Sequence, residues 1–180
     1  MLDRSKSLDK TNSMVKKIIY MILIASIIGG CAYSVRASSY PHLKKIFVLP
    51  VQNKTSEYDI TDEVQRAIPE KVRSDGRLKL VTLGADCQLE CIVLDYQEKI
   101  YSYDSANQVQ EYQANMLFSV QFTDLTTNQV LYENKNLLVS ETWSTGVGNP
   151  TSRFKTKEEA RNEIYRKLFE TIIKNTLEAW

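Results

Sequence analysis

The sequence predicts an α+β fold: a two-layer sandwich with two helices on one face of a mostly antiparallel sheet of about five strands, in the order β-α-β-β-β-β-α. Two long stretches, 87–101 and 108–124, alternate apolar and polar residues as half-buried strands do, and a turn-forming segment separates them. Two other segments repeat apolar residues every three or four positions, which is typical of amphipathic helices.

The first strand is predicted at 45–51, where a short apolar run includes Pro50. Proline has no N–H to donate to a neighbouring strand, so we expect it at a strand end or edge. A polar loop is expected at 52–59.

The first helix begins near Ile60, with Asp59 or Thr61 as its cap, and ends at the Asp75-Gly76 pair. Pro69 lies inside this segment, and we expect it to kink or interrupt the helix. A short strand is expected at 78–83.

The long hairpin 87–124 is followed by a further strand at 130–143 and by a loop at 144–155. The second helix follows the capping-box sequence 156–159. Its charged residues, Arg161 and Glu163 among them, are expected to form a solvated face. With strands that alternate in direction, the hairpin tip, the loop 144–155 and the Asp75-Gly76 turn are expected at one end, together with the segment before the first strand.

An uncharged apolar run at 18–28 stands apart from this pattern. Eleven residues cover only about half of a bilayer core as a helix, so a secretory signal explains the run better than a transmembrane span. Lys16 and Lys17 precede the run, and translation from either Met1 or Met14 fits. The sequence 28–31, Ile-Gly-Gly-Cys, resembles a lipobox, and its Cys31 is the expected site of lipidation. The alternatives are a simple secretory signal with an incidental cysteine, or a short signal anchor.

These observations divide the chain into a lipoprotein signal peptide (1–30), a lipidated tether (31–44) and one α+β domain (45–180). Acylated Cys31 would hold the domain to a lipid bilayer, since several acyl chains anchor firmly. In lipoproteins of this kind, a residue other than Asp after the cysteine, here Ala32, is associated with export to the outer membrane.

The charge of the mature chain argues against nucleic-acid binding. The whole chain has 23 basic and 22 acidic residues. The segment 1–30 holds five of the basic and two of the acidic residues, so 18 basic and 20 acidic residues remain.

The sequence offers few groups for catalysis or metal binding. His42 is the single histidine, and no nucleophile, phosphate-loop or metalloprotease motif occurs. Cys87 and Cys91 are expected to be small buried residues, because residues four apart in a strand lie about 13 Å apart, too far for a disulfide. We therefore expect no enzyme activity, no metal and no cofactor.

Several segments in order resemble the LPS-assembly lipoprotein family LptE. The similar segments lie within about 31–175 and are 31–34, 45–55, 75–78, 85–86, 110–112 and 124–131. Their order and spacing are more specific than any one of them. Cys87, Glu90 and Cys91 depart from the family pattern.

The resemblance implies a non-enzymatic protein that sits in the lumen of an LptD-like outer-membrane β-barrel, as plug and assembly partner, and that takes part in delivering lipopolysaccharide to the cell surface. The domain would face the periplasm or the barrel lumen. Arg153 and Lys155, in the long loop, are the candidate ligands for lipopolysaccharide phosphates, because basic side chains donate to phosphate oxygens. A solvated loop is the alternative for these two residues.

A second class of protein also begins with a Val-Leu-Pro strand and a polar loop containing asparagine. It comprises periplasmic scaffold or secretion-accessory lipoproteins resembling the TolB N-terminal domain or curli-secretion lipoproteins. Such a protein would bind protein only.

Overall fold

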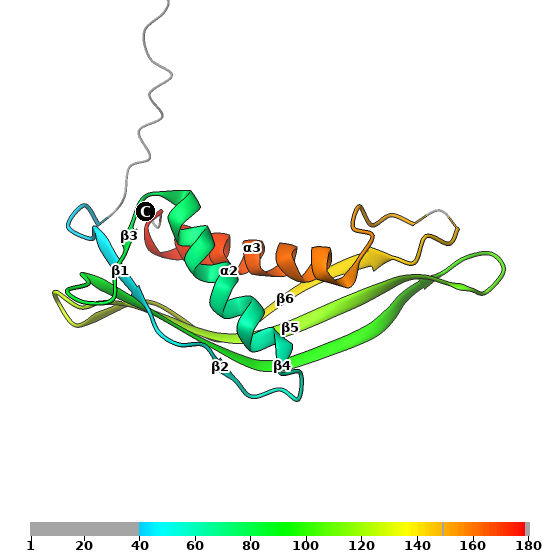
Figure 1. The fold of residues 1–180 in the computed structure, drawn as a ribbon, viewed down its shortest axis with the longest axis horizontal. Coiled ribbons are helices and arrows are strands. Elements are labelled where there is room, and N and C mark those ends of the chain that lie inside the picture. Colours follow the sequence, from blue (N-terminus) through cyan, green and yellow to red (C-terminus); the bar gives the residue numbers. More distant parts are fainter. Residues whose placement is uncertain (1–39, 149, 179–180) are drawn as a thin grey trace, which may run out of the picture. The chain divides into compact units, whose positions relative to one another are not determined.

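The computed structural model describes residues 40–148 and 150–178 of the 180-residue chain (Figure 1). The predicted signal segment 1–30 and most of the tether, including Cys31, lie outside these residues. The elements, in chain order, are β1 (Lys45–Val48), β2 (Gln52–Asn53), α2 (Asp59–Asp75), β3 (Lys79–Leu80), β4 (Cys87–Tyr103), β5 (Val109–Asp124), β6 (Gln129–Ser144) and α3 (Lys157–Thr176).

The strands form one mixed sheet in the order β3-β1-β4-β5-β6, and β2 pairs with β4 farther along that strand. The three long strands β4, β5 and β6 form the antiparallel meander that the alternating stretches predict. The short strands β1, β2 and β3 join it in parallel. The predicted fold class is thus confirmed, while the sheet has six strands because a two-residue strand forms in the expected loop 52–59.

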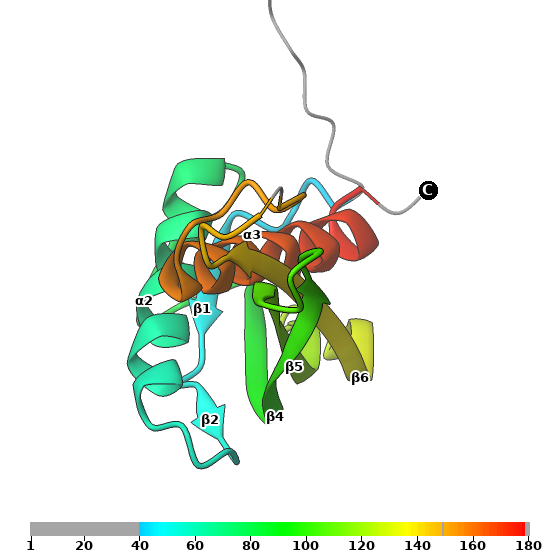
Figure 2. The same cartoon turned by 90° about the vertical axis from the view of Figure 1, so that its right-hand side faces the viewer.

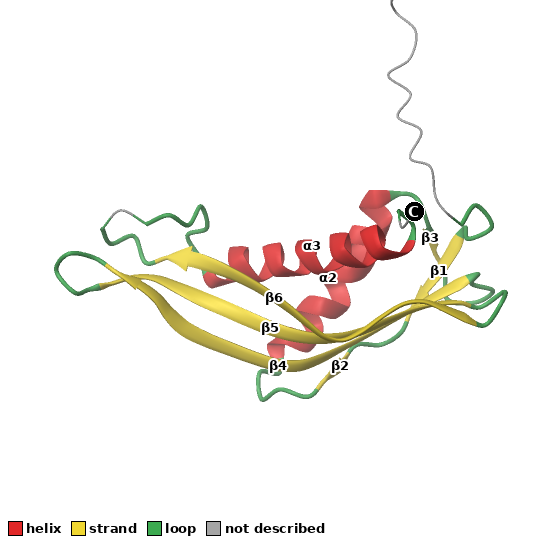
Figure 3. Ribbon diagram, turned by 180° about the vertical axis from the view of Figure 1, so that it is seen from behind, coloured by secondary structure: helices red, strands yellow, loops and turns green. Residues whose placement is uncertain are grey.

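Both helices cover the same face of the sheet (Figures 2 and 3). On β5 every second residue points toward them and is almost fully buried: Ala114, Met116, Phe118, Val120 and Phe122. The residues between them are partly exposed on the other face. Alternation of period two in the sequence therefore translates directly into one buried and one half-open face.

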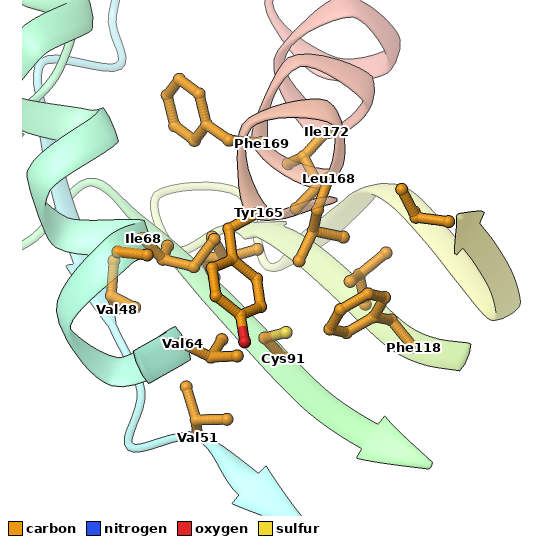
Figure 4. Packing of buried hydrophobic residues seen from close by; sticks show 14 of the residues in the cluster. Val48, Val51, Val64, Ile68, Cys91, Phe118, Tyr165, Leu168, Phe169 and Ile172 are labelled. Atoms are coloured by element: carbon orange, nitrogen blue, oxygen red, sulfur yellow. The ribbon is translucent and has the colours of Figure 1, made fainter. Parts of the chain in front are cut away.

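The core lies where α2, α3 and the inner sheet face meet (Figure 4). Val64 and Ile68 of α2 approach Tyr165 and Leu168 of α3 above Cys91 of β4. These side chains are fully buried or nearly so, and their burial is the main source of stability.

The helix ends follow the sequence signals in part. Gly76 adopts a left-handed conformation (φ 74°) and its N–H donates to the carbonyl oxygen of Val72, as predicted for the end of α2. Residue Tyr58, without a side-chain cap, precedes the helix instead of Asp59 or Thr61. Pro69 does not interrupt α2, which continues to Asp75. At α3 the Thr156 side chain accepts from the Glu159 N–H, which confirms the predicted cap.

The expected placement was wrong in two respects. The β4–β5 hairpin and the loop after β6 lie at one end, but the Asp75-Gly76 turn and the described residues before β1 (40–44) lie at the other (Figure 1). The reason is that β3 is parallel to β1, so α2 must return the chain to the level at which β1 begins. The Lys79 N–H accordingly donates to the Lys44 carbonyl oxygen (2.8 Å).

Replacing Phe118 with alanine should lower the free energy of unfolding by about 3–4 kcal/mol, because it removes a fully buried ring from the middle of the inner face. Leu138→Ala, on the neighbouring strand but 60% exposed, should cost less than about 1 kcal/mol. Urea unfolding measures both changes. Equal losses for the two variants would contradict the assignment of inner and outer faces.

Candidate functional site

Two segments far apart in the sequence meet at the hairpin end of the sheet, defined here as residues 101–110, 145–148 and 150–156. The Thr145 N–H donates to the Gln110 carbonyl oxygen (3.0 Å), and its hydroxyl donates to that of Val109 (2.8 Å). Gly148 has φ +68°, and a Cβ there would lie 3.0 Å from Asp104 Cβ and from Gln110 Oε1. The loop is therefore held closely against the hairpin, and glycine is required at that contact.

The carboxylate of Glu111 connects the hairpin to the loop. Its side chain is buried, and its carboxylate accepts hydrogen bonds from the hydroxyls of Ser102 (2.7 Å) and Thr151 (3.1 Å) and from the Ser152 N–H (2.5 Å). Burial raises the pKa of Glu111, but these hydrogen bonds outweigh it and the net pKa is lowered. One ionised carboxylate thus joins β4, β5 and the long loop.

The two predicted phosphate ligands lie in this loop, in different surroundings. Arg153 is exposed, yet its guanidinium pairs with Glu163 (2.9 Å) and covers the ring of Phe154 at 4.7 Å. The Lys155 N–H donates to Glu159, and the lysine residue itself is exposed. Arg153 is therefore held in position, whereas Lys155 extends from the start of α3.

Two shallow hollows share Arg153. One, of about 470 Å³, is lined by Ser144, Thr145 and Ser152 together with Lys155. The other, of about 480 Å³, carries Lys71 and Arg166 beside two carboxylates, Glu159 and Glu163. The first hollow, with basic and no acidic side chains in its lining, is therefore the better suited of the two to an anionic, oxygen-rich ligand.

An ion cluster joins the two helices to β4, and its centre is the buried Arg161, which is 2% exposed, whereas its partner Asp59 is 59% exposed. The expectation that Arg161 and Glu163 lie on a solvated face was wrong, since Glu163 is also buried. Arg161 Nη1 donates to Asp59 (2.8 Å) and Glu63 (3.0 Å) at the start of α2. Its hydrogen bond and charge lower the pKa of Asp59 against the opposing effect of burial.

The tyrosines of β4 and β5 divide between burial and exposure. Tyr96 lies under the Arg161 guanidinium (4.8 Å to the ring centre), and its hydroxyl accepts from Arg161 Nε (3.2 Å). Tyr112 stacks on Trp143 with the ring centres 5.5 Å apart. Tyr101 and Tyr103 are about half exposed at the hairpin end. These two rings are the ones that remain open to a partner.

The remaining candidates are distributed as follows. Cys87 and Cys91 are free and buried on the inner face of β4, as expected, and burial raises the pKa of each thiol to about 12. Within residues 40–148 and 150–178, no three His, Cys, Asp or Glu side chains are grouped so as to hold a metal ion. None of the helices among these residues has the length and hydropathy needed to span a membrane.

Comparison with known families gives one match. The profile of the family described as "LptE: Lipopolysaccharide-assembly" matches residues 43–176, which include every helix and strand of the structure. No curated protein sequence matches significantly.

Solved structures of similar fold share little sequence with this chain. The hypothetical protein CT253 from Chlamydia trachomatis is 11% identical, with a TM-score of 0.53 over 74% of this chain and 97% of that one. XCC0632 from Xanthomonas campestris is 12% identical (TM-score 0.47, 79% and 93% covered). Lipoprotein B from Nitrosomonas europaea is 13% identical (TM-score 0.44, 73% and 81% covered). The similarity to CT253 extends to the fold alone.

Glu111→Gln should loosen the loop at pH 7 and make its stability less dependent on pH. The pKa of Glu111 is lowered in the folded state, so its stabilisation is present above its ordinary pKa of 4.5 and is lost as the pH falls below that value. Hydrogen exchange of residues 150–155, corrected for intrinsic rates, measures the effect. The control is Glu133→Gln, which removes an exposed carboxylate that pairs with Lys135. It should leave the hydrogen exchange of residues 150–155 unchanged. Equal protection of the segment in both variants would contradict the role of Glu111.

Arg161→Met should lower the free energy of unfolding by about 2–4 kcal/mol, because it leaves Glu63, Asp59 and Tyr96 without their shared donor. Arg161→Lys should restore little of the loss, since an ammonium cannot reach all three acceptors in the same geometry. Arg66→Met, an exposed position on α2, is the matched control. A loss at Arg161 no larger than that at Arg66 would show that the cluster is not stabilising.

Proposed function

The chain belongs to the lipopolysaccharide-assembly family LptE, and from this premise we propose that it is a non-catalytic outer-membrane lipoprotein that plugs and helps assemble an LptD-type β-barrel. In this role it takes part in the delivery of lipopolysaccharide to the cell surface. The observation that carries the proposal is the family match, which extends from before β1 to the last residue of α3.

The proposed anchor is acylated Cys31, after removal of a signal peptide at 1–30. Residues 31–44 then form the tether, and 45–180 form the functional domain. The apolar run 18–28 and the small residues before the cysteine support this division. The domain would face the periplasm or the barrel lumen.

The outer face of the sheet supports a role in contact with a protein wall. Leu117 and Leu138 are register partners on β5 and β6, and Leu138 is 60% exposed. Tyr101 and Tyr103 are about half exposed at the hairpin end. Exposed apolar and aromatic side chains of this kind are typical of surfaces that bind a partner.

The hairpin end is the proposed site of lipopolysaccharide contact, with Arg153 and Lys155 as ligands for phosphate groups. Lys155 is exposed, and Arg153 lies at the edge of both hollows. A phosphate that binds Arg153 would compete with the ion pair between Arg153 and Glu163. Lys155 would therefore bind phosphate without having to give up such a pair.

Affinity purification from detergent-solubilised outer membranes tests the barrel partnership. We expect the tagged full-length chain to retain a large β-barrel protein and lipopolysaccharide, and its mass to include acyl groups at Cys31. A Cys31→Ala variant should lose those acyl groups. Recovery of a different envelope complex without a barrel would favour the protein-only scaffold and contradict the proposal.

Charge reversal of the two basic residues tests the lipid contact. Arg153→Glu with Lys155→Glu should lower lipopolysaccharide retention about tenfold, which corresponds to about 1.4 kcal/mol. Lys135→Glu with Lys174→Glu removes two exposed lysines elsewhere and should leave retention unchanged. Equal retention by the two double variants would place the lipopolysaccharide contact elsewhere.

A further inference from the structure

The long strand β6 forms one edge of the sheet, because it pairs with β5 on one side and ends the strand order (Figure 2). Its pairing with β5 is regular from residue 137 to residue 144. In a regular antiparallel pair, every second residue of the outer strand turns its backbone N–H and carbonyl oxygen away from its neighbour. Those groups of β6 therefore face outward from the sheet.

The loop after β6 closes the last part of this edge. The Ser144 N–H donates to the Phe154 carbonyl oxygen (2.8 Å), and the Ser152 hydroxyl donates to the Thr142 carbonyl oxygen (2.7 Å). Both contacts are made on the side of β6 that faces away from β5. The even-numbered residues of this stretch are therefore the ones whose backbone groups face outward.

A β-bulge closes the edge on the other side. The register of β6 against β5 shifts between Asn134 and Leu137, and the Asn136 N–H donates to the Asn134 side chain (2.9 Å). Bulges and covering loops are devices by which proteins protect a sheet edge from further pairing. Residues 137–141, called here the edge window, lie between the bulge and the covered part.

The edge window offers backbone groups and one exposed apolar side chain. Leu138 and Ser140 are its outward-facing residues, and Leu138 is 60% exposed. Within the part of the chain that the structure describes, the N–H groups of both residues and the Leu138 carbonyl oxygen have no hydrogen-bond partner. Lys167 Nζ lies 3.4 Å from the Ser140 carbonyl oxygen. A short open stretch between two protected ones suits one extended segment of a partner protein.

A hollow of about 430 Å³ lies beside the edge window, between β6 and α3. Lys167, Glu170 and Lys174 of α3 bring charge to its lining. Lys167 pairs with Glu141 (2.6 Å), and Glu170 pairs with Arg166. Lys174 is exposed and forms no ion pair among residues 40–148 and 150–178. The unbalanced charge of the hollow is therefore positive, which favours an acidic side chain in the segment that fills it.

We propose that the edge window binds an extended segment of the barrel protein, which adds to the sheet as a further strand beside β6. Side chains of a strand alternate between its two faces. One set of the segment's side chains would be apolar and lie beside Leu138, and the other would lie over the hollow and include an acidic residue near Lys174.

This inference rests on the proposed function and adds to it the backbone groups through which the domain is held in the lumen. Leu138 also belongs to the outer sheet face that the proposed function places against a protein wall, so the added strand continues that contact. An exposed ion pair contributes little to binding. Lys174 would therefore help to select the segment, while the backbone of Leu138 and Ser140 would hold it.

Hydrogen exchange tests the backbone pairing in the full-length chain. The chain is measured with the barrel, as recovered from detergent-solubilised outer membranes, and without the barrel in the same detergent, with fragmentation that resolves single amides. We expect exchange at the Leu138 and Ser140 amides to slow by about tenfold or more in the barrel complex. The Asn136 amide, which already donates to Asn134, is the matched control and should change by less than about twofold.

A proline variant tests the same contact by competition. Leu138→Pro removes one outward N–H and leaves the hydrogen bonds to β5 in place, whereas Leu138→Ala keeps the N–H. Each variant is expressed together with a differently tagged wild-type chain, and the ratio of the two in the barrel complex is measured by mass spectrometry. We expect Leu138→Pro to be recovered about fivefold or more below the wild type, and Leu138→Ala less than about threefold below it.

Thermal unfolding of each variant without the barrel shows whether it folds, and the exchange measurement alone decides if Leu138→Pro does not. Unchanged exchange at both amides, or equal recovery of the two folded variants, would overturn the proposal. Protection that forms without the barrel and rises with protein concentration would place a second copy of this chain at the edge, and would also overturn it. In each of these cases, a wild-type chain that recovers the barrel leaves the proposed function intact. A wild-type chain that recovers no barrel would reject that function and the added strand with it.

Discussion

Burial of one face of the three long strands is the constraint on which the rest of the structure depends. The alternating side chains of β4 and β5 leave an apolar surface that no other part of the sheet covers, so both helices must lie across it. Because β1 runs parallel to β4, the chain after β1 must run back along the sheet, and α2 forms this connection. In the same way, α3 follows β6 and runs back across the sheet. The antiparallel meander extends beyond the helices, so at one end the hairpin is covered by neither helix and contacts the loop after β6 instead (Figure 1).

Polar groups then determine the relative positions of the helices, the hairpin and the loop, which apolar burial alone does not specify. Arg161 joins the start of α2 to β4 and α3, and Glu111 joins the free hairpin to the loop before α3. Apolar contacts tolerate sliding, whereas a buried charge requires its partners in defined positions. The two groups therefore keep the hairpin end and its basic residues in a constant relation to the core.

Periodicity predicted the α+β class, both helices and the three long strands, because each is long enough for its pattern to be unambiguous. The two-residue strand β2 escaped prediction, since so short a segment has no period, whereas β3 was expected as a longer strand over 78–83. The parallel pairing of β3 with β1 was not foreseen, and it places the Asp75-Gly76 turn at the other end. Arg161 was assigned to a solvated face because its burial depends on acidic partners about 100 positions earlier in the chain. Of the candidate site, the loop carrying Arg153 and Lys155 was identified from its composition, but the buried Glu111 that holds it was not.

Membership of the lipopolysaccharide-assembly family, and the hollow beside Arg153 and Lys155 at the hairpin end, together support lipopolysaccharide contact at that end. A photo-activated cross-linker in place of Lys155, in growing cells, tests the role of the hairpin end most directly. We predict adducts that contain lipopolysaccharide, and weaker ones from a cross-linker in place of Leu83, which is exposed in the connection between β3 and β4 at the opposite end of the sheet. Adducts at position 155 with envelope proteins alone, and lipopolysaccharide at neither position, would contradict it.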